Sequence, residues 1–279
     1  MQTRMPVTER LWAALVWALT VFFIVNLLAM IATVLTSSFA TRWLGTWLPA
    51  GWTTKWYFSA WDEFQLGDVL TVTFEIVFAV VALSGLIGIP AAYAMARREF
   101  AGKRVLMLLF LLPLLVPPVT FGIPLATLLY KSGLGGTMAG VIAANLVPAV
   151  PFVILVMIPF IEQIDPKIEA AARVFGAGTF QLFRLVLLPL LLPGALAALL
   201  LVLVRTVAMF ELTFLTAGPD SQTLVVALYY SVFAAGVRAV QSIDAMAVIY
   251  MLTTLVWLIV ALQFVSPTQF VTRGRQVQR

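Results

Sequence analysis

Three ionisable side chains lie within long apolar stretches of the sequence, where a charge is costly. Glu75 lies in "VLTVTFEIVF", and Arg205 and Glu211 lie in "LVRTVAMFELTF". A charge at membrane depth costs at least about 2.5–3.5 kcal/mol on insertion scales, so such residues normally face a bundle interior or an aqueous cavity. We therefore consider them candidates for an intramembrane ion pair or for the lining of a solute pathway. Glu75 and Arg205 are predicted to lie at similar depths in the membrane, which would permit an ion pair between them. Arg205 and Glu211 are six residues apart on one predicted helix, so they cannot both line one narrow stripe of its surface.

Other reactive chemistry is sparse in this chain. Histidine and cysteine are absent, and no cluster of Asp and Glu offers a metal site or acid–base catalysis. No G-x-x-x-x-G-K-[ST] phosphate loop is present, so the chain does not bind ATP by that route. We expect no catalytic, cofactor-binding or metal-binding residue. A membrane enzyme and an ion-coupled secondary transporter remain rival classes, although no internal repeat of the kind common in such transporters is evident.

Composition identifies the surroundings of these residues. Of 279 residues, 62% are apolar and only 10% are charged, against about 25% charged in a typical soluble domain. A helix needs about 20 mostly apolar residues to cross the hydrocarbon core. Six segments qualify, and lipid-facing strands with open edges are excluded, so we expect an all-α integral membrane protein. The predicted spans are about 11–35, 69–96, 105–130, 138–161, 187–215 and 245–265.

The basic residues indicate an orientation. Twelve of the 17 Lys and Arg lie in the N-terminal segment 1–10, the 97–104 loop, the 162–189 loop and the tail 266–279. Because cytoplasmic loops carry the excess of basic residues, both termini and the 162–189 loop are predicted to be cytoplasmic, flanking a transmembrane domain of residues 11–265. The basic balance is thus explained by topology, and no nucleic-acid partner is expected.

Residues 165–194, "DPKIEAAARVFGAGTFQLFRLVLLPLLLPG", form an unusually polar stretch between two spans. Asp165 and Pro166 are typical of a helix start, and Gly176 is typical of its stop. We expect a short helix to Phe175 with an i,i+4 pair between Glu169 and Arg173. Gly176 and Gly178 then allow a sharp turn, and Thr179 can cap a second helix. Such an elbow suits docking into a groove of a soluble subunit, with a position on the lipid surface as the alternative.

The spacing within this stretch resembles the EAA loop of the permease subunits of bacterial ABC importers, whose pattern is Glu-Ala-Ala, three residues, Gly, nine residues, Ile-x-Leu-Pro. Here Ala171 and Ala172 precede Gly176, and Pro189 ends the pattern in "VLLP". The family's Glu falls on Ala170, and a carboxylate occurs one residue earlier at Glu169, which is rotated by about 100° on a helix. The resemblance extends over roughly residues 50–265. It implies that the ATPase-coupling residues are Glu169, Ala170, Ala171, Ala172, Arg173, Gly176 and Pro189.

This resemblance also implies the fold and the assembly. The fold would be the six-helix, MetI-like fold of type I importer permeases in a bacterial inner membrane. The partners would be a second permease subunit, most simply a different chain, an ATPase pair that holds ATP and Mg, and an extracytoplasmic substrate-binding protein. The residues "WTTKWY" and "AMARREFAGKR" look like the polyamine, opine and phosphonate branch. Permeases for sugars, thiamine and ferric ion share much of this pattern.

Two further features of the sequence leave alternatives open. The first outer loop holds five of the eight tryptophans. They could form an aromatic belt at the membrane interface or a docking surface for the binding protein. Spans three and four are rich in proline, which bends helices either for simple packing or for a pathway that opens alternately.

Overall fold

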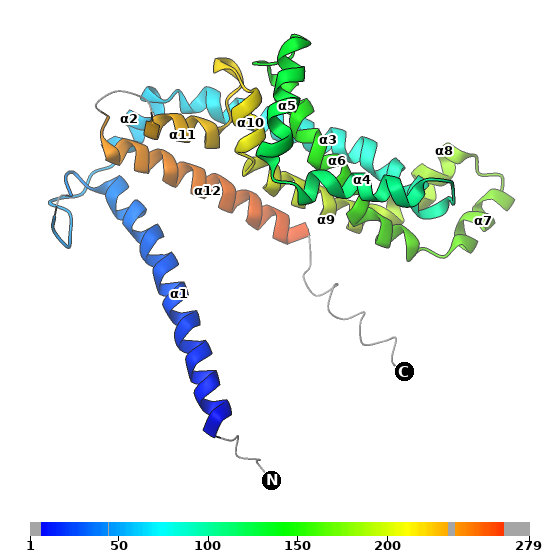
Figure 1. The fold of residues 1–279 in the computed structure, drawn as a ribbon, viewed down its shortest axis with the longest axis horizontal. Helices are drawn as coiled ribbons and strands as arrows, with labels where there is room; N and C mark the ends of the chain where they lie inside the picture. Colours follow the sequence, from blue (N-terminus) through cyan, green and yellow to red (C-terminus); the bar gives the residue numbers. More distant parts are fainter. Residues whose placement is uncertain (1–6, 44, 234–237, 265–279) are drawn as a thin grey trace. The chain divides into compact units, whose positions relative to one another are not determined.

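The structure is a computed structural model that describes residues 7–43, 45–233 and 238–264 (Figure 1). In these residues the regular elements are helices, which confirms the all-α expectation. Within the described ranges, five helices are long and apolar enough to cross a membrane, and the number is six if one sharply bent pair counts as a single span. The predicted tail, 266–279, and the first six residues of the predicted N-terminal segment lie outside the described part.

The described chain divides into two compact units, of which the first comprises residues up to Gln65 together with Ser231–Ile249. Its helix α1 (Val7–Phe39) contains the first predicted span, and α2 (Lys55–Glu63) lies in the tryptophan-rich loop. The indole N–H of Trp56 donates to the carbonyl oxygen of Ala40 at 2.7 Å. Trp56 therefore ties the loop to the segment after α1, whereas Trp47 is 98% exposed and fits either alternative proposed for the loop.

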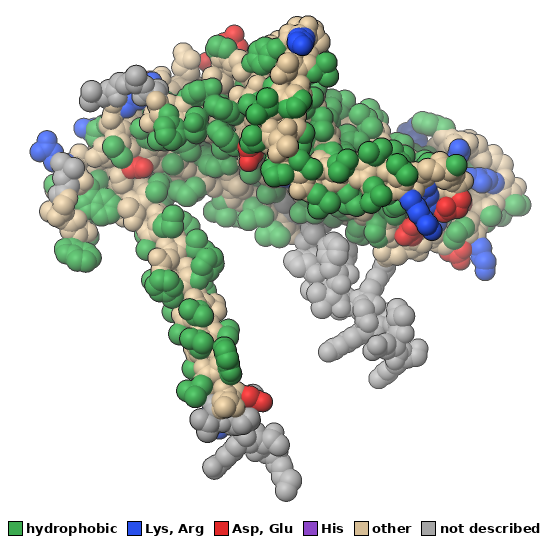
Figure 2. Space-filling view, viewed as in Figure 1, with side chains coloured by type: hydrophobic (Ala, Val, Ile, Leu, Met, Phe, Trp, Pro, Cys, Tyr) green, Lys and Arg blue, Asp and Glu red, His purple; other side chains and the backbone are tan. Residues whose placement is uncertain are grey.

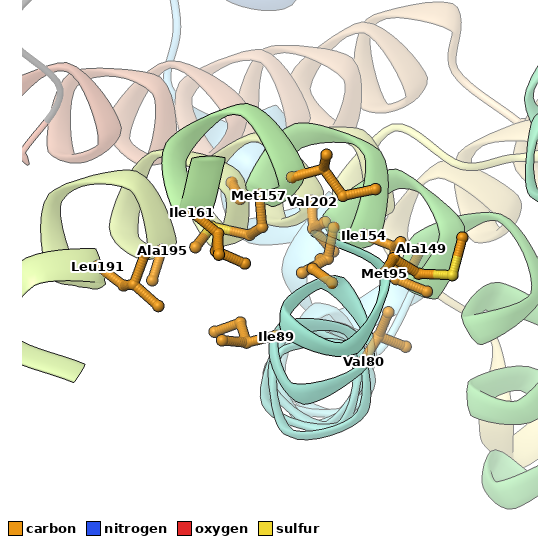
Figure 3. Close-up of a cluster of buried hydrophobic side chains, with 14 of the residues drawn as sticks. Val80, Ile89, Met95, Ala149, Ile154, Met157, Ile161, Leu191, Ala195 and Val202 are labelled. Atoms are coloured by element: carbon orange, nitrogen blue, oxygen red, sulfur yellow. The ribbon is translucent and has the colours of Figure 1, made fainter. Parts of the chain in front are cut away.

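The second unit is built on three long helices that pack against one another: α3 (Leu66–Arg97), α6 (Met138–Glu162) and α9 (Leu188–Val207). Apolar side chains from all three interleave in the largest buried cluster (Figure 3). This cluster reaches the end of the unit where α3 and α6 finish, because Met95 and Ile161 belong to it. A continuous apolar core thus runs along the unit.

Glycines allow these helices to approach closely. A Cβ added to Gly88 of α3 would lie 2.7 Å from Cγ1 of Val153 in α6, and one added to Gly194 of α9 would lie 2.6 Å from the Phe160 ring. Helices in membranes associate by van der Waals packing, which small residues at the contact make possible. The α3–α6 and α6–α9 contacts therefore depend on the missing side chains of these glycines.

The third predicted span, 105–130, is broken in the structure. Helix α4 (Lys103–Leu115) and helix α5 (Pro118–Lys131) meet at an angle of 100°. Pro117 and Pro118 lack backbone N–H groups, and Val116 before them is extended, as the residue before a proline prefers. The expected proline bend is thus a full corner, and α5 packs against α10 (Glu211–Thr216).

The fifth predicted span, 187–215, also differs from the observed helix. Helix α9 ends at Val207, and Glu211 begins the separate helix α10. After α10 the chain forms a short turn, η2 (Pro219–Ser221), and helix α11 (Leu224–Phe233), before the last span α12 (Val240–Phe264). Backbone groups in this region are held by other helices: the N–H of Leu224 donates to Thr73 Oγ1 of α3 at 2.9 Å.

We expect Gly88→Ala to destabilise the second unit despite the better helix propensity of alanine. Val153 is fully buried and branched at Cβ, so it cannot move away from the new methyl group without strain of about 1–3 kcal/mol. Combining Gly88→Ala with Val153→Gly removes both close contacts of the new methyl group, 2.7 Å to Cγ1 and 2.8 Å to Cβ of Val153, and should cost less than the sum of the two single variants. Thermal unfolding of detergent-solubilised protein measures this, and strict additivity would refute the close contact.

Candidate functional site

The short helix α7 (Pro166–Val174) follows α6, as the sequence predicts. The Asp165 side chain accepts a hydrogen bond from the backbone N–H of Lys167 at 2.9 Å, and Pro166 occupies the first turn. The helix ends at Val174, and Gly176 has a φ of +86°, a conformation that side chains with a Cβ rarely adopt. The predicted helix and its glycine stop are confirmed to within one residue.

The second arm of the elbow begins one residue earlier than expected. Helix α8 (Thr179–Gln181) is preceded by Gly178 at the N-cap position, and Gln181 Oε1 accepts a hydrogen bond from the Gly178 N–H at 3.0 Å. The prediction that Thr179 caps this helix is therefore wrong. The glutamine side chain satisfies a backbone N–H group at the helix start.

Glu169 lies on the inner face of α7, and only 6% of it is exposed. Arg97 Nε donates to Glu169 Oε1 at 2.7 Å, and the Tyr93 hydroxyl donates to Glu169 Oε2 at 2.5 Å. A second guanidinium nitrogen of Arg97 donates to the carbonyl oxygen of Ile164 at 2.7 Å. One arginine and one tyrosine from the last turns of α3 therefore hold both the helix α7 and the connection that leads into it.

This arrangement replaces the ion pair expected from the sequence. Glu169 and Arg173 were predicted to pair along α7, but the Glu169 carboxylate forms its ion pair with Arg97, and Arg173 is exposed. A buried carboxylate needs strong donors, and Arg97 with Tyr93 supplies two charge-assisted bonds that an exposed i,i+4 partner cannot match. We name the contact of Tyr93, Arg97 and Glu169 the α3–α7 clamp.

The other faces of α7 divide between core and solvent. Ala172 packs against the large apolar cluster, whereas Ala170 and Ala171 are exposed. Phe175, at the end of the helix, is 90% exposed. Most of the apolar side chains of α7 are thus exposed, and a shallow hollow lies inside the elbow. This hollow is lined by Ala172, Phe175, Gly176, Ala177, Gln181, Leu185 and Val186.

Between α8 and α9 the backbone forms a π-helix, η1 (Leu182–Leu187). The N–H of Leu188 donates to the carbonyl oxygen of Phe183, five residues back, just before Pro189. Proline lacks an N–H and its ring clashes with the carbonyl four residues earlier, so the wider π turn relieves this crowding. Pro189 therefore fixes an irregular turn where the elbow joins the fifth span.

The intramembrane charges do not form the pair considered above. Glu75 is exposed on α3, while the Arg205 guanidinium lies 5.7 Å from the centre of the Phe152 ring. In the described part of the chain no ion pair includes Glu75, Arg205 or Glu211. Arg205 lies in the last turn of α9 and Glu211 starts α10, so the two are not on one continuous helix as expected.

Sequence reasoning missed Tyr93 and Arg97. Arg97 was counted only among the basic residues that set the orientation of the chain, and nothing in the sequence near residue 97 points to residue 169. A weak signal existed in the "AYAMAR" end of α3, which places Tyr93 and Arg97 four residues apart on one helix face.

Comparisons with known proteins identify the family to which the chain is similar. A family model described as "Binding-protein-dependent transport system inner membrane component" matches residues 84–270. A diacetylchitobiose uptake system permease protein of Streptomyces coelicolor is 30% identical over 191 residues, which cover 67% of this chain and 63% of that protein. A sulfate transport system permease protein of Salmonella typhimurium is 30% identical over 173 residues (57% and 62%). A molybdenum transport system permease protein of Haemophilus influenzae is 32% identical over 160 residues (51% and 69%).

The chain spans about three fifths of the length of the first two of these relatives. The names of the three relatives give a sugar, sulfate and molybdenum. They therefore lend no support to the likeness to the polyamine, opine and phosphonate branch. A solved bacterial ABC transporter that imports the acidic polysaccharide alginate has a chain with a TM-score of 0.75 at 16% identity, covering 94% of this chain and 99% of that one. This similarity confirms the fold of the importer permeases.

The α3–α7 clamp predicts a large effect of Arg97→Ala. Removing the guanidinium leaves the buried Glu169 carboxylate without its cation, which costs about 3–5 kcal/mol of the free energy of unfolding. Adding Glu169→Gln neutralises the orphaned charge and should recover much of the loss. Thermal unfolding in detergent measures both variants.

A matched control is the exposed pair between Lys103 and Glu99, whose ionic atoms also lie 2.7 Å apart. Lys103→Ala should cost less than about 1 kcal/mol because water screens this pair. Equal losses for Arg97→Ala and Lys103→Ala would show that burial gives the clamp no special strength.

Proposed function

The chain belongs to the family of binding-protein-dependent transport system inner membrane components, and we propose that it is one permease subunit of an ATP-driven importer whose separate ATPase docks on residues 165–184. The family is described as an inner membrane component of binding-protein-dependent transport systems. The single observation that carries the proposal is the elbow of α7 and α8. It is an exposed helix pair that the chain itself fastens to the end of its membrane core.

The α3–α7 clamp gives the elbow a mechanical role. A push on α7 reaches α3 through Arg97 and Tyr93, and it reaches the apolar core through Ala172. On the other arm, Leu182 and Leu187 of η1 are buried in the same core. Closure of the ATPase around the elbow therefore moves α3 and α9 together. That movement switches the access of the solute pathway, while ATP and Mg remain on the ATPase.

The exposed carboxylate of Glu75 supports a pathway that this chain completes with a second subunit. In the described residues no ion pair includes it, and a bare carboxylate at membrane depth needs either an aqueous cavity or a partner. We assign Glu75 to the pathway formed between two permease subunits. Arg205 and Glu211 are secondary candidates, because both are partly buried.

The substrate is proposed to be a small polar solute, with an organic cation such as a polyamine as the first candidate. Two of the three intramembrane charges are carboxylates, and one of them, Glu75, is exposed. A sugar is the second candidate, because Phe210, Phe214, Tyr229 and Tyr230 form a ring cluster whose two tyrosines are 36% and 42% exposed. Aromatic faces offer an apolar platform to a sugar ring. Binding of a polyamine and of a disaccharide to the cognate binding protein would distinguish the two.

The proposed orientation places both termini and the elbow in the cytoplasm and the tryptophan-rich loop outside. It rests on the distribution of Lys and Arg along the sequence. In this orientation the ATPase reaches α7, and the binding protein reaches the loop that contains Trp47 and Trp56.

Two neighbouring glycines provide a matched test of the coupling role. Gly176→Val places a β-branched residue at a φ of +86°, so the elbow must change shape and uptake should become uncoupled from ATP hydrolysis. Gly178 has a φ of −68°, and a Cβ added there would meet no atom closer than 3.9 Å. Gly178→Ala should therefore behave as wild type. Uptake and ATP hydrolysis are measured on the same proteoliposomes. Full coupling in Gly176→Val would remove the elbow from the mechanism.

A further inference from the structure

The elbow exposes its basic side chains to a partner but buries the acidic side chain that the sequence places among them. Between Pro166 and Leu187 the chain has one acidic residue, Glu169, and three basic ones, Lys167, Arg173 and Arg184. The α3–α7 clamp buries the carboxylate, whereas all three basic side chains are exposed. The accessible charge of this segment is therefore entirely positive.

The positive charges accompany exposed apolar side chains. Val174 and Phe175 are 86% and 90% exposed, and Phe180 and Leu185 on the second arm are 72% and 68% exposed. The hollow of the elbow lies between Phe175 and Leu185. Charged side chains gather at the end of the unit that carries α7 and α8, whereas the neighbouring surface of α4 is hydrophobic (Figure 2). A partner that covers residues 166–187 must therefore cover apolar side chains and also accept cations.

The register of α7 determines which residues meet that partner. Lys167, Ala170 and Arg173 are spaced three apart, so they lie along one side of the helix, and each is exposed. Glu169 and Ala172 lie on the inner side. Ala170 is the position at which the EAA pattern has its glutamate. A carboxylate at Ala170 would lie between the two basic side chains and cancel part of the positive charge of this side.

From these contacts we propose that residues 166–185 form a basic and apolar docking surface, and that its partner ATPase has a cleft with an apolar floor and acidic side chains at the rim. The inference deepens the importer function proposed above and rests on it. An anionic lipid surface would also attract basic and apolar side chains. The ATPase fits better because the elbow is hollowed and α7 carries alanine at Ala170 and Ala171 beside its basic side chains, which allows close protein contact.

The test compares Ala170→Glu with Ala170→Gln, which has the same size but no charge. The permease pair is immobilised in detergent, and the dissociation constant of its purified ATPase is measured at two salt concentrations. Ala170→Glu should bind at least about tenfold more weakly than Ala170→Gln because its carboxylate faces an acidic rim. The double variant Lys167→Gln, Arg173→Gln should also weaken binding, and salt should affect it less than wild type. Equal or tighter binding of Ala170→Glu, or salt-independent binding of wild type, would overturn the acidic rim.

Two controls separate the ways in which the proposal can fail. If the wild-type permease does not bind the ATPase, the importer function itself fails; if it binds without any response to these charges, only the acidic rim fails. The lipid alternative is tested with Val174→Cys carrying a polarity-sensitive dye, because the chain has no other cysteine. Adding ATPase to protein in anionic nanodiscs should shift the dye to an apolar environment. A dye that is already in an apolar environment without ATPase would overturn the proposal in favour of lipid.

Discussion

The buried carboxylate of Glu169 is the constraint on which the proposed coupling depends. A charge that is nearly inaccessible to water must be paired, and Arg97 and Tyr93 at the end of α3 provide that pairing. Helix α7 has only nine residues, too few to be stable alone in water. The ion pair and the packing of Ala172 therefore do more than orient α7: they make it part of the membrane core.

The rest of the second unit extends this connection across the membrane. Glycines bring α3, α6 and α9 close together, and the apolar cluster reaches from Val80 to Leu182 beneath the elbow. Beyond the core, the corner between α4 and α5 receives α10, and buried hydrogen bonds hold α10 and α11 to neighbouring helices. Because packed helices move as rigid bodies, a displacement at α7 is transmitted along α3 to the level of Glu75.

Local chemistry explains which features the sequence could predict. Asp165, Pro166 and Gly176 determine the ends of α7 through capping and backbone freedom, so its bounds were predictable. Hydropathy located the long helices for the same reason, because lipid requires apolar residues over a fixed length. The 100° corner at Pro117 was only partly predictable, since proline indicates a bend but gives no angle.

Tertiary contacts explain what the sequence could not predict. The break after Val207 occurs at Ala208–Phe210, which contains neither glycine nor proline, so no local signal marks it. Arg97 pairs with a residue 72 positions away, and the nearer partner Arg173 was therefore the simpler expectation. Counting residues gave Glu75 and Arg205 similar depths but could not show which way they face. In the structure Glu75 is exposed and Arg205 lies over the Phe152 ring.

If the α3–α7 clamp couples the elbow to the membrane core, α7 and the end of α3 must move as one body. Spin labels on cysteines at Ile168 and Arg98 test it, since both positions are exposed, neither is a docking cation named above, and the chain has no native cysteine. The distance between the labels is measured in the assembled transporter with and without ATP. With the wild-type clamp the distance should be the same in both states, whereas with Arg97→Ala it should depend on ATP. A distance that changes with ATP while the clamp is intact would contradict it.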